Sequence, residues 1–297
     1  MRWVWSLGGL SPGELARRVW VAIDSDALFD RAAQLSYYFL LALFPLLICL
    51  SALLGFLFAG KAELYHDLLR YLQSAMPSAA YQLVRATVDE ITIGASGNKL
   101  SLGLAATLWT ASSGMEALIN GLNVAYDVKE RRSWWRRRIV AIVLTVMVAV
   151  MTTLALSLAL AGGHFGRILA ERFGLGDVFA VTWALAQLVL PLVFMLVVCA
   201  LIYRFAPNVR EHGWQALMPG AFVAVTLWFI ATSLFRFYLS VFDSYSKTYG
   251  SLGAVIVLLL WLYLCGAAVL IGGEVNAEIR KAAAAAGAEE AQKPIEA

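Results

Sequence analysis

Charged residues are scarce in this sequence, at 14% of 297 residues, whereas hydrophobic residues make up 61%. Soluble domains contain about 25% charged and about 45–50% apolar residues, so this chain is too apolar for a soluble protein. A barrel of the outer-membrane type is also excluded, because its strands alternate apolar and polar residues and contain no apolar runs of about 20 residues. The composition therefore predicts an all-α polytopic membrane protein.

Residue types that carry metal and redox chemistry are also rare. The three cysteines lie in separate apolar runs and the three histidines in separate connections: Cys49, Cys199, Cys265, His66, His164 and His212. No pair has the spacing of a metal or redox motif, and no glycine-rich phosphate-binding loop is present. We therefore expect no metal, no other cofactor, no catalytic residue and no ATP-driven pump.

Six uncharged runs are long enough to cross about 30 Å of hydrocarbon at about 1.5 Å per residue, the second only with the next helical turn. They are Ala32–Gly60, Leu100–Met115, Ile139–Gly163, Val178–Tyr203, Trp214–Phe235 and Thr248–Gly273. The 23 Lys and Arg divide 15 to 8 between the two sides that these runs define. Because positive loops stay in the cytoplasm, both termini are expected there.

The chain divides into three regions. In residues 1–31 we expect a cytoplasmic segment with a helix on the membrane surface, whose start is a capping box with proline at its first position, Ser11, Pro12 and Glu14. Its apolar stripe, Leu15, Val19 and Ile23, would face the lipid. Residues 32–280 would form the six-helix domain, with an amphipathic hairpin on its outer face at 61–99. Residues 281–297 are predicted to be a solvated cytoplasmic tail, partly helical but disordered as a whole, with no fold of its own.

Polar residues in a membrane helix must face protein or water, so their placement is the main functional signal. The second run and the turns that continue it contain Ser112, Glu116, Asn120, Asn123 and Asp127, whose spacing puts them on one helical face. This face would be either the wall of a substrate cavity or a structural hydrogen-bond seam between helices. Glu116 lies deepest, where burial would favour the protonated carboxyl and allow a proton-coupled role.

The cytoplasmic ends of the fourth and sixth runs add further polar groups. Arg204 stands just before Pro207, where capping of the helix is one interpretation and an ion pair with Glu274 is another. The predicted cavity residues are Ser112, Glu116, Asn120, Asn123, Tyr126, Arg204, Asn208, Glu274 and Asn276.

Several short motifs follow one another in a recognisable order. They are Ala33–Pro45, Leu108–Ser112, Asn123–Tyr126, Tyr203–Asn208, Pro219–Gly220, Tyr249–Gly253 and Glu274–Glu278. In combination the sequence resembles the YihY/BrkB family of bacterial inner-membrane proteins, formerly labelled ribonuclease BN. The resemblance implies six membrane helices and a link to envelope integrity and serum resistance, and some members are proposed to move lipids or other solutes. It supplies neither a substrate nor a catalytic residue.

Three functions are compatible with these features. The leading hypothesis is a non-ATP-driven transporter or flippase-like protein of the inner membrane, with membrane lipids or an amphiphile as partners. The alternative is a non-transporting scaffold for envelope assembly. A ribonuclease is the least favoured, because the acidic residues form no metal-binding cluster. The basic run Arg131–Arg138 is interpreted as an anchor to anionic headgroups rather than a nucleic-acid site, and the oligomeric state stays open.

Overall fold

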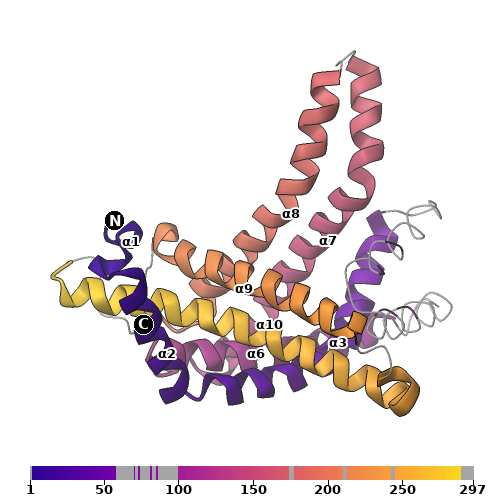
Figure 1. The fold of residues 1–297 in the computed structure, drawn as a ribbon. Helices are drawn as coiled ribbons and strands as arrows, with labels where there is room; N and C mark the ends of the chain where they lie inside the picture. Colours follow the sequence, from indigo (N-terminus) through magenta and orange to yellow (C-terminus); the bar gives the residue numbers. More distant parts are fainter. Residues whose placement is uncertain are drawn as a thin grey trace.

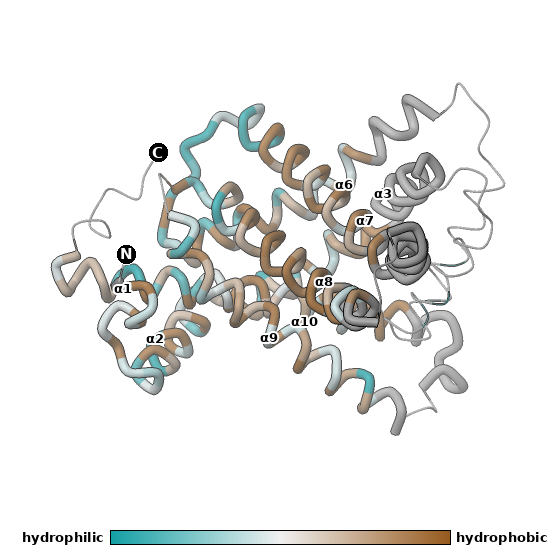
Figure 2. Tube along the Cα trace, turned by 90° about the horizontal axis from the view of Figure 1, so that it is seen from above, coloured by the Kyte–Doolittle hydropathy of each residue, from teal (hydrophilic) through white to brown (hydrophobic). Residues whose placement is uncertain are grey.

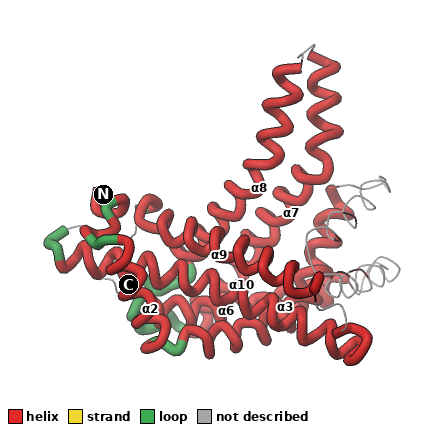
Figure 3. Tube along the Cα trace, viewed as in Figure 1, coloured by secondary structure: helices red, strands yellow, loops and turns green. Residues whose placement is uncertain are grey.

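The protein is described here from a computed structural model that covers residues 2–57, 70, 73, 81, 85, 100–173, 177–209, 213–241 and 245–288. The described chain is helical, with short connections (Figure 3). Three short elements come first: α1 (Arg2–Trp5), η1 (Leu7–Gly9) and α2 (Pro12–Ser25). Six long helices follow: α3 (Leu28–Leu57), α6 (Leu100–Ala125), α7 (Trp134–Phe173), α8 (Asp177–Phe205), α9 (Trp214–Val241) and α10 (Tyr245–Ala285). The predicted all-α architecture is confirmed.

Each of the six uncharged runs falls on one long helix, as far as the chain is described. Among the described side chains, three segments are long and apolar enough to span a membrane: Trp134–Ala155, Trp214–Tyr238 and Val255–Ala285. Val189–Phe205 is a shorter apolar helical segment of the same kind. The predicted outer-face hairpin at 61–99 lies outside the described residues, apart from four isolated positions.

The long helices form a packed group from which one hairpin projects. α3, α6, α9 and α10 pack together, while α7 and α8 run side by side and diverge from them (Figure 1). α1 and the end of α10 lie near each other at one end of the packed group (Figure 1). Hydrophilic residues gather at this end, and hydrophobic residues follow α7, α8 and α9 (Figure 2). The polar contacts described below lie mainly at this end.

The N-terminal helices pack on protein. Ser11 caps α2, because its hydroxyl accepts a hydrogen bond from the Glu14 backbone N–H at 3.2 Å. The apolar stripe Leu15, Val19 and Ile23 is buried in the main hydrophobic core, and α2 and η1 both contact α10. The expectation that this stripe faces lipid was therefore wrong, since α10 supplies the apolar surface that it covers.

The last helix is longer than the sequence predicted. α10 continues to Ala285 and ends in a Schellman motif, in which Gly287 has φ +86° and the N–H groups of Gly287 and Ala288 bond back to Ala284 and Ala283. Ala282 and Ala283 are buried. The predicted solvated tail from residue 281 is corrected to this extent, because an alanine run favours the helix and Gly287 is the first residue that stops it.

Candidate functional site

Glu116, the predicted proton site, binds two arginines of α7. Its Oε1 lies 2.6 Å from Nη2 of Arg137 and its Oε2 lies 2.8 Å from Nη1 of Arg138. The Arg138 side chain is only 5% exposed, stacks 4.0 Å from the ring centroid of Trp109 and donates to the Trp109 carbonyl. Two hydrogen-bonded guanidinium groups hold this carboxylate in place. Glu116 thereby joins α6 to α7.

A second polar cluster ties the end of α6 to the end of α8. The side-chain oxygen of Asn123 accepts a hydrogen bond from the Asn208 backbone N–H at 2.7 Å, and the Asn123 amide donates to Glu130 at 2.9 Å. The Asn208 amide donates to the Lys129 carbonyl at 3.1 Å. Arg132 binds Glu130 at 2.7 Å and also donates to the carbonyl of Ala206, beyond the end of α8. Carbonyl groups at the end of a helix have no hydrogen-bond donor within the helix, and Arg132 supplies one at the end of α8.

The charge of Glu130 depends on these donors. Burial would raise the pKa of the Glu130 carboxyl, yet hydrogen bonds from the side chain and backbone N–H of Arg132 and from Asn123 outweigh burial and lower it. Glu130 is therefore ionised and holds the connection between α6 and α7 against α8.

Asn276 bridges α10 to the first turns of α9. Its side-chain oxygen accepts from the Gly220 N–H at 2.7 Å, and its amide donates to the Leu217 carbonyl at 3.2 Å. Pro219 lies in this part of α9 and has no N–H to donate. Nearby, the Tyr203 hydroxyl donates to the Val269 carbonyl at 2.7 Å, which joins α8 to α10.

The expected pairing of Arg204 with Glu274 finds no support in their contacts. The Arg204 guanidinium lies 5.3 Å from the ring centroid of Trp214, whereas Glu274 faces Asp26 at the end of α2. The remaining predicted residues differ in their surroundings. Ser112 is buried and donates to the Trp109 carbonyl of its own helix, and Asn120 is exposed. Tyr126 is buried at 3% exposure and lies close to Asn276 and Glu274.

The structure thus brings Asn123 and Asn208 together and places Glu116, Asn276 and Arg204 in separate contacts between helices. Among the described residues, these polar groups are used to hold helices together. This arrangement corresponds to the hydrogen-bond seam, the alternative interpretation of the polar face.

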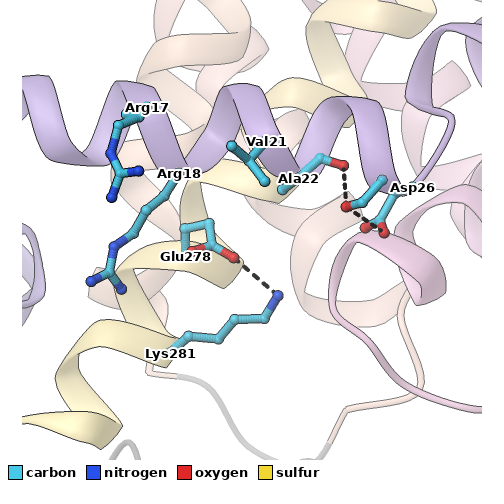
Figure 4. Close-up of a pocket in the computed structure, with 8 residues that line it drawn as sticks. Arg17, Arg18, Val21, Ala22, Asp26, Glu278 and Lys281 are labelled. Carbon is cyan, nitrogen blue, oxygen red and sulfur yellow. Dashed lines mark hydrogen bonds and ion pairs between the residues drawn. The ribbon is translucent and has the colours of Figure 1, made fainter.

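An open charged pocket of about 340 Å³ lies elsewhere, between α2 and α10 (Figure 4). Its lining residues are Arg17, Arg18, Val21, Ala22, Ser25, Asp26, Glu278 and Lys281. Three cations and two carboxylates therefore face one space. Lys281 binds Glu278 at 3.0 Å. Glu14 accepts hydrogen bonds from both arginines, which lower the pKa of its carboxyl to about 2, so it stays ionised and orients them.

An apolar groove of about 430 Å³ runs between α9 and α10, with Phe29 of α3 beside it. Its lining residues are Phe29, Leu227, Ile230, Ala231, Leu234, Phe235, Tyr238, Leu260, Leu264, Ala267, Ala268 and Ile271. Ile230 and Leu234 are 50% and 63% exposed, so the groove is open on the outer surface of the helices. In a bilayer, this surface would meet lipid chains.

The pocket and the groove lie along one face of α10. Leu264 and Ile271 of the groove and Glu278 and Lys281 of the pocket are separated by 7, 7 and 3 positions, and Glu274 lies between the two sets. Such spacing places residues on one side of a helix. The chain from α2 into α3 borders both spaces. Sequence reasoning missed this arrangement because it assigned α2 to the lipid surface, although the i, i+3 and i+4 spacing along α10 was readable.

Comparison with known proteins gives consistent results. Residues 19–296 match the family model described as Virulence factor BrkB. A Bacillus subtilis protein named Putative ribonuclease-like protein YfkH is 39% identical over 253 residues, which cover 85% of this chain and 90% of that protein. A UPF0761 membrane protein of Photobacterium profundum is 28% identical over 261 residues, covering 86% of this chain and 78% of that protein. No solved structure matches.

The family match extends over most of the chain and agrees with the helical, apolar fold. It also confirms the resemblance that the sequence motifs indicated. The chain belongs to the BrkB family of membrane proteins.

Proposed function

We propose that the protein is a non-ATP-driven transporter or flippase-like protein for a lipid or other amphiphile. The observation that supports this proposal most directly is that one face of α10 carries both the charged pocket and the apolar groove. An amphiphile has a polar head and an apolar chain, so it needs both environments side by side. The pocket volume of about 340 Å³ falls within the range of about 300–1,000 Å³ that is typical of small-ligand sites.

The charges of the pocket suit a phosphate-bearing headgroup. Arg18 and Lys281 approach the space from α2 and α10, and arginine and lysine are the usual partners of phosphate (Figure 4). The chain of the same molecule would lie in the groove beyond Phe29. The environment is the bacterial inner membrane, with both termini in the cytoplasm. This topology is favoured by the excess of Lys and Arg on one side and by α1 and the end of α10 sharing one end of the fold (Figure 1).

Lipid retention tests the site directly. The full-length protein is extracted into native-membrane nanodiscs, and co-purified lipids are identified by mass spectrometry. We expect the double variant Arg18→Ala with Lys281→Ala to lose a lipid that the wild type retains. The matched control is Arg136→Ala, an exposed arginine outside the pocket.

The groove has its own pair of variants. Ala231→Phe on α9 fills the groove, and Ser233→Phe adds the same ring to an exposed position of α9 that does not line it. Movement of a labelled phospholipid between the leaflets of ATP-free proteoliposomes should fall at least tenfold for Ala231→Phe only. Two results together would contradict the proposal: co-purified lipid with the same composition as the surrounding membrane in every nanodisc sample, and equal rates of lipid movement for Ala231→Phe and Ser233→Phe.

A scaffold without transport is the second candidate. It is favoured by the use of Glu116, Asn123, Asn208 and Asn276 in contacts between helices. If this role is the right one, variants of these residues and of the pocket lower the amount of protein in the membrane, and no variant changes the rate of lipid movement per molecule.

A further inference from the structure

Glu274 is a buried carboxyl group between the charged pocket and the apolar groove. It is 1% exposed, and its Oε2 atom has no hydrogen-bond partner among the described residues. Buried polar atoms in native proteins are nearly always hydrogen-bonded, and an unpartnered one calls for a functional explanation. A buried ionised carboxylate is the most unfavourable case, and such groups usually stay neutral by holding a proton.

Asp26 faces Glu274 from the turn between α2 and α3. The two residues line the same small void, one from each side of the packing between α2 and α10. Together with Arg31, Gly121 and Leu270 they border this void, which is too small to hold a water molecule. A carboxyl can bond another carboxyl only when one of them carries a proton, and close like charges cannot both be ionised. A metal cation would need space and several oxygen ligands, so the occupant that fits is a proton.

The charged neighbours do not neutralise this pair. Arg31 Nε donates to the backbone carbonyl of Asp26 at 2.9 Å, and Lys281 binds Glu278 at 3.0 Å. The titratable and charged groups that face the pair are Arg31 of α3, Tyr126 after α6, and Glu278 and Lys281 of α10. Arg17 and Arg18 of α2 line the open pocket beside Asp26, and both bind Glu14. The Glu278 carboxylate adds to the reasons for the pair to retain a proton.

Asp26 also connects the pair to water. Its side chain borders the open pocket between α2 and α10 as well as the closed void, and it is partly exposed (Figure 4). A route for the proton therefore exists without a channel through the helices.

We propose that Asp26 and Glu274 form a proton-binding site, loaded from the open pocket through Asp26. A hydronium ion in the pocket gives its proton to an Asp26 carboxylate oxygen and leaves as water. The proton then passes to Glu274, as the O–H bond on Asp26 breaks and one on Glu274 forms. One proton is bound in total and no redox step occurs. The proton site itself is independent of any lipid.

The consequence for lipid movement rests on the proposed function. Asp26 borders the space that would hold the headgroup. When the proton moves from Asp26 to Glu274, the charge of Asp26 changes, and the headgroup meets a different charge. Headgroup binding and proton binding are then linked, and each changes the affinity for the other by the same factor. Proton binding at this site would then drive or regulate the movement of the lipid.

Infrared spectroscopy of the full-length protein in nanodiscs tests the site without any substrate. A protonated carboxyl has a C=O band that is separate from that of the carboxylate. We expect a band of this kind to persist in the wild type at neutral pH, where exposed carboxyls are ionised. Glu274→Gln should abolish it and Asp26→Asn should shift or weaken it, whereas Asp24→Asn, an exposed residue of α2 outside both spaces, should leave it unchanged.

Absence of the band in the wild type, or its persistence in Glu274→Gln, would overturn the proton site. Because the wild type alone can give the negative result, the test does not depend on the folding of a variant. A band with the expected behaviour together with bulk-like lipid in the retention experiment would keep the proton site and overturn the transporter. Retained lipid without the band would keep the transporter and overturn the proton site.

Discussion

Gly220 of α9 and Gly272 of α10 bring the two helix backbones into contact. A Cβ atom on Gly220 would lie 2.1 Å from the Gly272 backbone oxygen, and one on Gly272 would lie 2.5 Å from the Gly220 oxygen and 2.2 Å from the Tyr203 hydroxyl. Small residues allow this approach in membrane helix pairs. The contact also admits the Asn276 amide to the first turns of α9.

Gly272→Ala should therefore destabilise the protein strongly. The obstructing atoms include backbone, which cannot move aside like a flexible side chain, so the cost should reach about 3 kcal/mol, the upper part of the usual range for overpacking. Thermal unfolding in detergent measures it. Gly13→Ala is the control, because its Cβ meets nothing within 4 Å and alanine favours a helix. Equal melting temperatures for the two variants would contradict the close contact.

Glu116→Gln should lower the amount of folded protein. It removes the charge that balances Arg138, whose side chain is 5% exposed, and breaking such a pair from one side costs about 3–5 kcal/mol when fully buried. Quantitative immunoblotting of membranes gives the abundance. Asn120→Ala, on an exposed position of the same helix, should have little effect. Normal abundance with a changed rate per molecule would favour a direct role of Glu116 in transport.

Glu130 should make stability fall in acid. Its folded-state pKa is lowered from the ordinary value of 4.5, so the unfolded chain takes up a proton first as the pH falls. The stabilisation is thus complete above this value and is lost as the pH drops below it, through the folded-state pKa. Melting temperatures of wild type and Glu130→Gln should converge as the pH falls below 4.5. A constant difference over this range would show that the Glu130 charge is not the cause.

Asp127→Gly should stabilise the end of α6. Asp127 has φ +54° at the C′ position of a Schellman motif, in which the N–H groups of Asp127 and Val128 bond to the carbonyls of Val124 and Asn123. Glycine adopts this conformation without strain, so a gain of about 0.5–1 kcal/mol is expected. Asp127→Val should have the opposite sign in the same unfolding measurement. A melting temperature that does not differ between these two variants would argue against the motif.

The long helices could be predicted from sequence because each depends on a local property, the length of an uncharged run. The start of α2 was also readable, since Ser11, Pro12 and Glu14 act within one turn. Which residues a polar helical face will contact depends on the packing of distant helices, so it cannot be predicted from the neighbouring sequence. Glu116 was correctly placed on a long helix, yet nothing near it in sequence indicates that Arg137 and Arg138 return to it from the next helix.

The pocket between α2 and α10 was missed for a related reason. An amphipathic helix with the stripe Leu15, Val19 and Ile23 suits a lipid surface and a protein surface equally well. Only the tertiary structure shows that α10 is longer than its apolar run and offers the partner. The spacing of Glu274, Glu278 and Lys281 was visible, but its meaning depended on that packing.

Gly8 packs against the last turns of α10, where a Cβ would lie 2.5 Å from the Ile279 backbone oxygen and 3.0 Å from Ala282. The N-terminal elements therefore dock on a helix that comes after all the other described helices in the chain. Their contacts with α10 can form only once α10 has been made and inserted, so this part of the fold is completed late. A truncation that removes the final turns of α10 would release the N-terminal helices as well, and damage at either end of the chain would have the same result.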